Sequence, residues 1–239
     1  MPTTTNAADP RDRLIFALDV PDATAARRVA EELGAAITFY KVGLELMAAG
    51  GYFELVDWLL ARNKRVFADL KLFDVPATVG RAISLLAKRG ITFATIHGNQ
   101  GIMEAAAAAK GDLKILAVTV LTSLDRGDLT DLGFQCDVEA LVLSRARRAL
   151  EAGCDGVVAS GLELPAMRRA IDGRLLVVTP GIRPVENRPS DDQKRVVSVE
   201  QAFGDGADYI VVGRPIRDAQ QPRAAAEAIQ QTIAGLFPS

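Results

Sequence analysis

The amino-acid sequence predicts an α/β fold, a single (β/α)8 barrel (TIM barrel). Short apolar runs rich in β-branched residues recur along the chain, and each is followed by a longer stretch with helical periodicity. Eight such pairs, spaced by roughly 30 residues, indicate parallel βαβ units. The length of 239 residues also suits a barrel of ~250 residues. A doubly wound open sheet is the main competing architecture, because it is built from the same units.

The expected strands are short apolar segments bounded by polar residues, glycine or proline. Because a barrel strand is buried on both faces, such segments need not alternate between apolar and polar residues. In chain order they cover residues 14–20, 37–42, 65–71, 93–97, 113–120, 156–160, 175–179 and 209–213.

The expected helices carry recognisable start and stop signals. Pro76 and Pro222 open two of them, because proline is favoured in the first helical turn. Gly34, Gly90 and Gly153 stand where glycine commonly ends a helix. In chain order the predicted helices cover residues 22–33, 51–63, 76–89, 100–110, 137–152, 161–170, 198–204 and 222–236.

No linker rich in proline, serine or glycine interrupts this pattern, so one catalytic barrel domain is expected over residues 13–239, preceded by a flexible N-terminal tail over residues 1–12. The first residues have neither the basic nor the apolar region of a signal peptide. Apolar runs fall short of the ~18 residues that a membrane span requires. We therefore expect a cytoplasmic protein with no membrane partner.

One connection is unusually long. Residues 180–197 contain Pro184, Asn187, Pro189 and Ser190 and show no apolar periodicity. A loop of this length in a compact domain is usually a lid or a binding loop. It follows the seventh strand, where barrels commonly hold a phosphate group.

The charge balance restricts the partners. The chain has 28 Lys and Arg against 30 Asp and Glu, a net charge of −2, which gives no electrostatic basis for binding nucleic acid. Any anion site has to be local.

Cys136 and Cys154 are too few for a disulfide framework or a metal cluster, and we expect free thiols in a reducing compartment.

The densest group of charged residues is the segment Asp69-Leu-Lys71-Leu-Phe-Asp74 at the end of the third strand. Side chains alternate along a strand, so Asp69 and Lys71 point to the same side, towards the mouth of the barrel where active sites form. Asp74 follows just before Pro76. Carboxylates near a lysine keep it protonated, so Lys71 is expected to serve as a cation or proton donor and not as a Schiff-base nucleophile.

Two further charges end neighbouring strands, Asp19 on the first and Lys41 on the second. A charge at a mostly apolar strand end is costly unless it has a partner. Each residue alone would fit a surface ion pair. Together with Asp69 and Lys71 they favour one shared site, because a barrel brings the ends of its strands together.

An anion site is predicted after the eighth strand, at Gly213 and Arg214. Glycine lets backbone N–H groups approach an anion closely, and arginine offers a two-pronged donor that suits phosphate. Arg183 and Gln193 in the long connection add donors. The alternative is an ordinary helix-start glycine beside a surface arginine.

Several other chemistries lack support in the sequence. His97, the chain's one histidine, has no second histidine or cysteine at ligand spacing, so we expect it to support the site by hydrogen bonding and not to bind a metal. The serines lack a histidine partner for nucleophilic catalysis. Neither a Gly-x-Gly-x-x-Gly nor a Walker motif is present, so dinucleotide and NTP binding are disfavoured.

Taken together, these residues resemble the orotidine 5′-phosphate decarboxylase family, in the family's order and over residues 13–237. The segment around Asp69 and Lys71 is highly specific to this family when Lys41 is also present. Ala77 is a small departure, since many bacterial members carry Asn or Thr there. The matching segments are Ala17-Leu-Asp19, Tyr40-Lys41-Val-Gly43, Asp69-Leu-Lys71-Leu-Phe-Asp74-Val-Pro76-Ala-Thr78-Val, Val118-Thr-Val-Leu-Thr122-Ser123, Thr179-Pro-Gly181-Ile-Arg183 and Val211-Val-Gly213-Arg214.

The resemblance implies a homodimeric barrel that converts orotidine 5′-phosphate to UMP and CO₂ in pyrimidine biosynthesis, without metal or cofactor. Lys71 would protonate C6 of the pyrimidine, and Asp69 would lie near the substrate carboxylate, with Lys41 and Asp74 completing a charge network. Asp74 and Thr78 would come from the neighbouring subunit. The residues expected to bind substrate are Asp19, Lys41, Asp69, Asp74, Val75 and Thr78 near the ribose and reacting carbon, Thr122 and Ser123 at the pyrimidine, and Arg183, Gln193, Gly213 and Arg214 at the phosphate.

Two alternatives remain. Mg²⁺-dependent sugar-phosphate decarboxylases and aldolases of the same superfamily share the Asp-x-Lys-x-x-Asp motif, but they carry a Glu metal ligand where this chain has Lys41. A lysine cannot bind Mg²⁺, which requires hard oxygen ligands. The second alternative is a nucleotide-binding barrel without catalysis, since fold alone does not establish function. Such a module has no reason to keep four mutually constraining charges beside its ligand.

Overall fold

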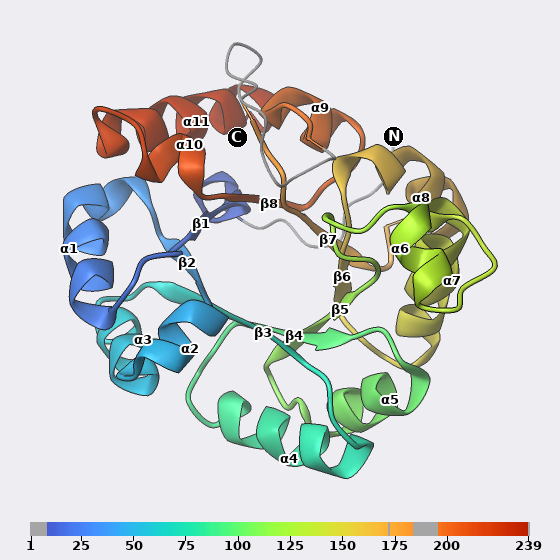
Figure 1. Cartoon of the computed structure of the whole chain (residues 1–239). Helices are drawn as coiled ribbons and strands as arrows, with labels where there is room; N and C mark the ends of the chain where they lie inside the picture. The colour runs from blue at the N-terminus through green and yellow to red at the C-terminus, as the bar shows by residue number, and fades with distance from the viewer. Residues whose placement is uncertain (1–8, 172, 184–195, 239) are drawn as a thin grey trace.

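The computed structural model describes residues 9–171, 173–183 and 196–238, and its eight parallel strands form a closed barrel surrounded by helices (Figure 1). Each strand pairs with its neighbours in sequence, and the last strand closes on the first. The predicted (β/α)8 barrel is therefore confirmed. The strands are β1 (Leu14–Ala17), β2 (Phe39–Gly43), β3 (Arg65–Leu72), β4 (Phe93–His97), β5 (Lys114–Val118), β6 (Gly156–Val158), β7 (Leu176–Thr179) and β8 (Tyr209–Val212).

Eight helices match the predicted ones within a few residues, and local capping explains several of their starts. The side chains of Asp22, Asp137 and Ser198 accept hydrogen bonds from backbone N–H groups in the first turns of three of them. These helices are α1 (Ala23–Leu33), α3 (Tyr52–Leu60), α4 (Pro76–Ala87), α5 (Gln100–Ala109), α7 (Val138–Glu151), α8 (Leu164–Ile171), α9 (Val199–Gly204) and α11 (Pro222–Leu236).

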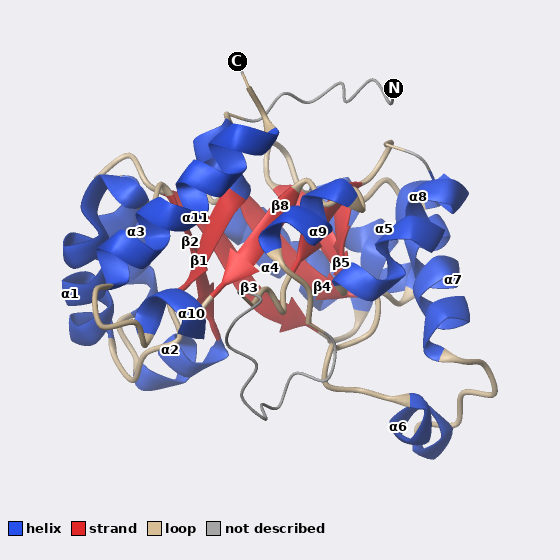
Figure 2. Ribbon diagram, turned by 90° about the horizontal axis from the view of Figure 1, so that it is seen from above, coloured by secondary structure: helices blue, strands red, loops and turns tan. Residues whose placement is uncertain are grey.

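Among the described residues, three short α-helices were not predicted, and each is the first helix after a strand. They are α2 (Leu44–Ala49) after β2, α6 (Arg126–Asp131) after β5 and α10 (Arg214–Arg217) after β8. Segments of four to six residues are too short to show a helical period. All three lie towards the end of the barrel to which the strands run (Figure 2). They therefore shape the mouth of the barrel, where a (β/α)8 enzyme holds its active site.

The inside of the barrel is filled by an aromatic cluster. The rings of Phe39, Phe67 and Tyr209 surround Phe93, with centroid distances of 5.1, 6.0 and 5.1 Å. All four side chains are almost fully buried. A second, larger apolar layer lies between the barrel and its helices. The aromatic cluster closes the barrel from within, so a cavity can form only beyond it, at the strand ends.

The chain before β1 packs against the barrel. Residues 1–8 of the expected tail lie outside the described residues, but Pro10–Arg13 forms a 3-10 helix capped by Asp9. Arg11 donates to the carbonyl oxygen of Ala35 at 2.8 Å. The segment Pro10–Arg13 is therefore hydrogen-bonded to the rest of the domain through Arg11.

The long connection after β7 is described only at its two ends. Residues 184–195, which include the predicted phosphate donor Gln193, lie outside the described residues. Ile182 and Val197 form a parallel bridge, and the backbone N–H of Arg183 donates to the carbonyl oxygen of Val197 at 3.0 Å. The two ends of the connection therefore lie side by side at the end of β7.

Candidate active site

A cavity of about 430 Å³ opens at the C-terminal ends of the strands. Asp19, Lys41, Asp69, Lys71 and Arg214 all line it. Each follows or ends a strand, so the closed barrel brings together side chains that are far apart in sequence. The structure thus brings the four charged side chains together at one cavity.

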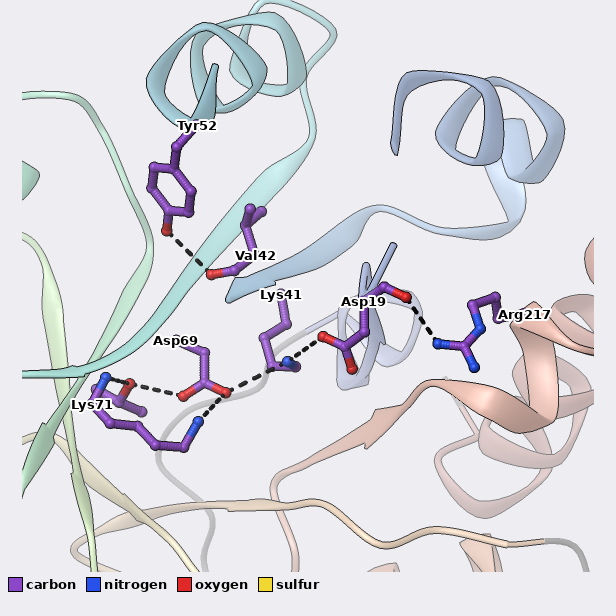
Figure 3. A network of polar contacts seen from close by, with 8 residues as sticks. Asp19, Lys41, Val42, Tyr52, Asp69, Lys71 and Arg217 are labelled. Carbon is purple, nitrogen blue, oxygen red and sulfur yellow. Dashed lines mark hydrogen bonds and ion pairs between the residues drawn. The ribbon is translucent and has the colours of Figure 1, made fainter. Parts of the chain in front are cut away.

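The four charges form a continuous chain of alternating sign (Figure 3). Lys41 Nζ lies 2.9 Å from Asp19 Oδ1 and 3.5 Å from Asp69 Oδ2. Lys71 Nζ lies 2.8 Å from the same Asp69 oxygen. Asp69 thus holds one lysine on each side, and each ammonium group has a fixed position at the cavity.

Burial and charge together set the ionisation of the central pair. The side chains of Asp69 and Lys41 are 10% and 13% exposed. Burial alone would raise the pKa of Asp69, but the charges of Lys41 and Lys71 and hydrogen bonds from Lys71 and Thr95 hold that pKa below its usual value. Burial would lower the pKa of Lys41, yet Asp69 and Asp19 hold it above its usual value. Both groups are therefore charged at neutral pH.

Lys71 has an unusual backbone conformation. Its φ is +47°, in the left-handed region that residues other than glycine rarely adopt, and the register between β3 and β4 shifts between Ala68 and Leu72. Such a conformation costs on the order of 1–3 kcal/mol and persists only where the surroundings enforce it. The backbone N–H of Lys71 donates to Thr95 Oγ1 at 3.0 Å. Asp69 and Lys71 do lie on the same side, as predicted, but an irregular stretch of β3 and not a regular strand places them there.

Asp74 does not flank Lys71 within its own chain. Its exposed carboxylate accepts from the backbone N–H of Val75 at 2.6 Å. Pro76 starts α4 directly afterwards and directs the connection away from the cavity. Among the described residues of one chain, Lys71 therefore has a single carboxylate partner, and the array of two carboxylates around it that the sequence predicts is not formed.

Two neighbours of Asp74 also lie outside the cavity lining. Val75 is 63% exposed, and Thr78 accepts a hydrogen bond from Arg81 at 3.1 Å. Of the two residues predicted for the pyrimidine, Thr122 lines the cavity, whereas Ser123 is exposed and is not part of the lining. In a single chain the cavity thus lacks Asp74, Val75, Thr78 and Ser123.

The part of the cavity wall that follows β7 and β8 carries arginines. Gly213, Arg214 and Arg183, which the sequence assigns to a phosphate site, all contribute to the wall. A Cβ atom on Gly213 would lie 3.3 Å from the Cβ of Ala17, tighter than ordinary packing, so glycine keeps β8 close to β1 here. The resulting pocket end is positively charged and suits an anion such as phosphate.

Arg217 also lines the cavity and was not predicted. Its Nη1 donates to the backbone carbonyl oxygen of Asp19 at 2.8 Å. The short helix α10 places Arg217 three residues, about one turn, after Arg214, so both reach the same region. Recognising this helix from the sequence would have identified the residue.

His97 takes part in packing at the edge of the site. It ends β4, is half-buried, and its ring lies 5.0 Å from that of Phe73 between centroids. Burial first, and then the charges of Arg145 and Lys71, lower the pKa of His97. His97 therefore supports the segment that follows Lys71 by a ring contact, where the sequence suggested a hydrogen bond.

Metal ligation has little to build on in this cavity. Within residues 9–171, 173–183 and 196–238, no three His, Cys, Asp or Glu side chains gather closely enough to hold an ion. Asp69, the acidic residue in the middle of the charged cluster, is already paired with two lysines.

Among the helices of the same ranges, none is long and apolar enough to cross a membrane.

Comparisons with known proteins agree with this geometry. The model of the "Orotidine 5′-phosphate decarboxylase / HUMPS family" matches residues 12–229. An orotidine 5′-phosphate decarboxylase of Methylococcus capsulatus is 68% identical over 95% of this chain and 93% of its own length, and one of Stenotrophomonas maltophilia is 52% identical over 93% of both. The crystal structure of orotidine 5′-phosphate decarboxylase from Lactobacillus acidophilus superposes with a TM-score of 0.83 at 33% identity, over 93% of this chain and 99% of that one. The chain therefore belongs to the orotidine 5′-phosphate decarboxylase / HUMPS family.

Proposed function

We propose that this protein is a carboxy-lyase that converts orotidine 5′-phosphate to UMP and CO₂ in pyrimidine biosynthesis, without a metal or cofactor. Its relatives at 68% and 52% identity carry the name of that activity over nearly their whole length. The observation that carries the proposal is the ammonium group of Lys71, held 2.8 Å from Asp69 at the wall of the cavity.

Loss of CO₂ from C6 of the pyrimidine leaves a carbanion that has no iminium group to accept its electrons. An ammonium group fixed beside C6 stabilises negative charge where it develops. Lys71 then supplies the proton that completes UMP, so one residue serves as electrostatic stabiliser and general acid. Its contact with Asp69 keeps Lys71 oriented towards the reacting carbon.

Asp69 and Asp19 have different tasks in this proposal. Asp69 lies beside the carboxylate of the substrate, where it fixes both lysines and opposes a second negative charge. Lys41 is held by the carboxylate of Asp19 at 2.9 Å, and these two residues together bind the ribose hydroxyls. The alternation of charge lets each group hold its neighbour in place.

The phosphate group is assigned to the arginine-rich end of the cavity. Arg214 and the backbone N–H of Gly213 bind it, with Arg183 and Gln193 as further donors. The phosphate is remote from the carboxylate that is lost, so its binding energy can be used to place C6 against Lys71. Thr122 and Ser123 are assigned to the pyrimidine.

A homodimer would supply the groups that one chain leaves outside its cavity. We assign Asp74, Val75 and Thr78 to the active site of the neighbouring subunit. Phe73 and Val75 on either side of Asp74 are 67% and 63% exposed, an unusual state for large apolar side chains. Contact with a second copy would bury both and carry Asp74 to the partner's Lys71 site.

The Mg²⁺-dependent sugar-phosphate reaction is the second candidate, because the family's description also includes the HUMPS group. The position where those enzymes carry an acidic metal ligand is Lys41, whose ammonium group contacts two carboxylates here. A cation at this position repels Mg²⁺ and occupies the oxygen atoms that would bind it. This contact favours the metal-free decarboxylase.

The deciding experiment follows the ultraviolet absorbance of orotidine 5′-phosphate in excess EDTA. Full activity is expected, since no step uses a metal. Activity that disappears on chelation and returns with Mg²⁺ would contradict the metal-free mechanism. Binding of UMP without any conversion of orotidine 5′-phosphate would instead indicate a nucleotide-binding module.

We also propose that the protein acts in the cytoplasm. Cys136 is exposed and Cys154 is buried, and both are free thiols. Unpaired cysteines are usual in a reducing compartment.

A further inference from the structure

The hydroxyl group of Thr95 lies between the two central residues of the charged cluster. Its Oγ1 donates a hydrogen bond to Asp69 Oδ1 at 2.8 Å and accepts one from the backbone N–H of Lys71 at 3.0 Å. Thr95 is on β4, next to β3, and is 0% exposed. The residue belongs to none of the motifs that identified the site from the sequence.

Both hydrogen bonds have a fixed direction. An ionised carboxylate only accepts and a backbone N–H only donates, so the single hydroxyl proton of Thr95 must point to Asp69. Its oxygen is then free to accept from Lys71. One hydroxyl therefore connects the carboxylate that holds both lysines to the backbone of one of those lysines.

The carboxylate of Asp69 is fixed by this contact. Oδ2 is shared by Lys71 Nζ at 2.8 Å and Lys41 Nζ at 3.5 Å, while Oδ1 bonds to Thr95. The ammonium groups end long, flexible side chains, but Thr95 has a short, branched and buried one. Rotation of the carboxylate plane would break the bond to Thr95, which is the most rigid of the three partners.

The same hydroxyl supports the irregular backbone at Lys71. The register of β3 and β4 shifts between Ala68 and Leu72, and Lys71 has a φ of +47°. A backbone N–H at such an irregularity needs an acceptor outside the regular ladder. Thr95 Oγ1 supplies it, and so stabilises the conformation that turns the Lys71 side chain towards Asp69.

We propose that Thr95 is a positioning residue of this active site, whose hydroxyl group sets both the carboxylate plane of Asp69 and the backbone conformation of Lys71. It acts through these two residues and is not itself part of the cavity lining. The inference rests on the proposed decarboxylase function for its effect on turnover, but the two hydrogen bonds have a consequence that needs no substrate.

The hydrogen bond from Thr95 affects the pKa of Asp69, whether or not substrate is bound. The groups that face Asp69 are Lys41 from β2, Lys71 from β3 and Tyr52 from α3, with Asp19 beyond Lys41. The bond from Thr95 is one of the contacts that hold the pKa of Asp69 below its usual value of 3.8. Removing the hydroxyl should move that pKa back towards 3.8.

The activity test compares Thr95→Val, which has nearly the same shape without the hydroxyl, with Thr95→Ser, which keeps it. The matched control is Thr119→Val. Thr119 is also 0% exposed, and its hydroxyl donates to the carbonyl oxygen of Val158 at 2.9 Å, away from Asp69. We expect Thr95→Val to lower kcat about 10- to 100-fold, the effect of one lost hydrogen bond to a charged group. The affinity for UMP should change little, Thr95→Ser should recover most of kcat, and Thr119→Val should match the wild type.

The substrate-independent test measures the free energy of unfolding against pH. Ionised Asp69 stabilises the fold above the unfolded pKa of 3.8, and this contribution is lost as the pH falls through its lower folded pKa. The stability advantage of the wild type over Thr95→Val should therefore be largest near neutral pH and shrink below 3.8. The difference between the wild type and Thr119→Val should stay constant with pH.

Each outcome has a distinct meaning. If the wild type does not release CO₂, the proposed function fails, while the stability measurement still tests the position of Asp69. If the wild type is active but Thr95→Val keeps kcat within about threefold of it, or Thr95→Ser recovers nothing, the hydroxyl does not position the site. Should Thr95→Val not fold, Thr95→Ala takes its place under the same two criteria.

Discussion

Arg217 and Asp19 are joined through the main chain: Nη1 of the guanidinium group donates to the backbone carbonyl oxygen of Asp19 at 2.8 Å. The carboxylate of the same aspartate accepts from Lys41 at 2.9 Å (Figure 3). Asp218 holds the guanidinium group from its other side at 2.6 Å. The helix that carries the predicted phosphate ligand is therefore connected to the charged cluster by one arginine.

We expect Arg217→Ala to lower kcat/KM by about tenfold or more, because a hydrogen bond from a charged group typically contributes about 1.5–3 kcal/mol. Loss of the contact frees the end of β1, and Asp19 then holds Lys41 less firmly. The control is Arg223→Ala, which breaks an exposed pair with Glu227 at 2.9 Å on α11, far from the cavity lining. Equal kinetics for the two variants would mean that Arg217 has no part in the site.

Lys71→Ala should remove the proton donor and the charge that stabilises the carbanion. A loss in kcat of at least about 100-fold is expected, with a folded protein that still binds UMP. Steady-state kinetics and calorimetric titration with UMP measure the two effects separately. Lys88→Ala, at an exposed position after α4, should behave as the wild type. A Lys71→Ala enzyme with more than a few per cent of wild-type kcat would place the proton donor elsewhere.

His97 offers a direct measurement, because it is the one histidine of the chain. Burial, followed by the charges of Arg145 and Lys71, lowers its pKa below 6.5, so its ring-proton NMR signal should titrate below that value. Neutral His97 is the favoured folded form, and the fold should lose stability as the pH falls from 6.5 towards the lower folded pKa.

The cause can be tested with two arginines of α7. Arg145→Met removes a positive charge near His97 and should raise the titration midpoint, whereas Arg147→Met alters an exposed residue and should not. Two results would contradict this explanation of the lowered pKa of His97. One is a titration midpoint at or above 6.5 in the wild type, and the other is a midpoint that does not change in Arg145→Met.

The fold and the central charges of the site were predictable from the sequence because both depend on local patterns. Eight apolar runs with helices between them define a barrel, and a barrel places the ends of neighbouring strands together. Asp19, Lys41, Asp69 and Lys71 each stand at such an end, so their meeting followed from topology alone. The helix boundaries given by Pro76 and Pro222 were likewise set by proline chemistry.

The missed features depend on exact backbone geometry. The left-handed conformation of Lys71 and the register shift in β3 have no sequence signature, since neither glycine nor asparagine stands there. Thr95 gains its two hydrogen bonds only through that irregularity. Helix α10 is four residues long, so its arginine pair could not be recognised by periodicity. The position of Asp74 depends on how Pro76 directs the start of α4.

The exposed position of Asp74 leads to the last prediction, which concerns subunit exchange. If each subunit lends Asp74 to its partner's site, then Lys71→Ala and Asp74→Asn homodimers are both nearly inactive, because every site lacks one charge. When the two variants are mixed at equal concentration and exchange subunits, about half of the dimers become heterodimers. In each heterodimer one site carries both defects and the other carries neither, since the contact is symmetric. About a quarter of all sites should then be intact, and activity should rise to about a quarter of the wild type.

A second mixture provides the control. Lys71→Ala and Asp69→Asn both alter residues that meet within one chain, 2.8 Å apart, so every site of their heterodimer keeps one defect and exchange should restore nothing. A pull-down with two different tags confirms that exchange has taken place in both mixtures. If the Lys71→Ala and Asp74→Asn mixture exchanges yet stays at the activity of its parents, Asp74 serves its own subunit. The connection between Lys71 and Pro76 would then have to fold inward when substrate binds, and the exposed Phe73 and Val75 would need another explanation than a second copy of the chain.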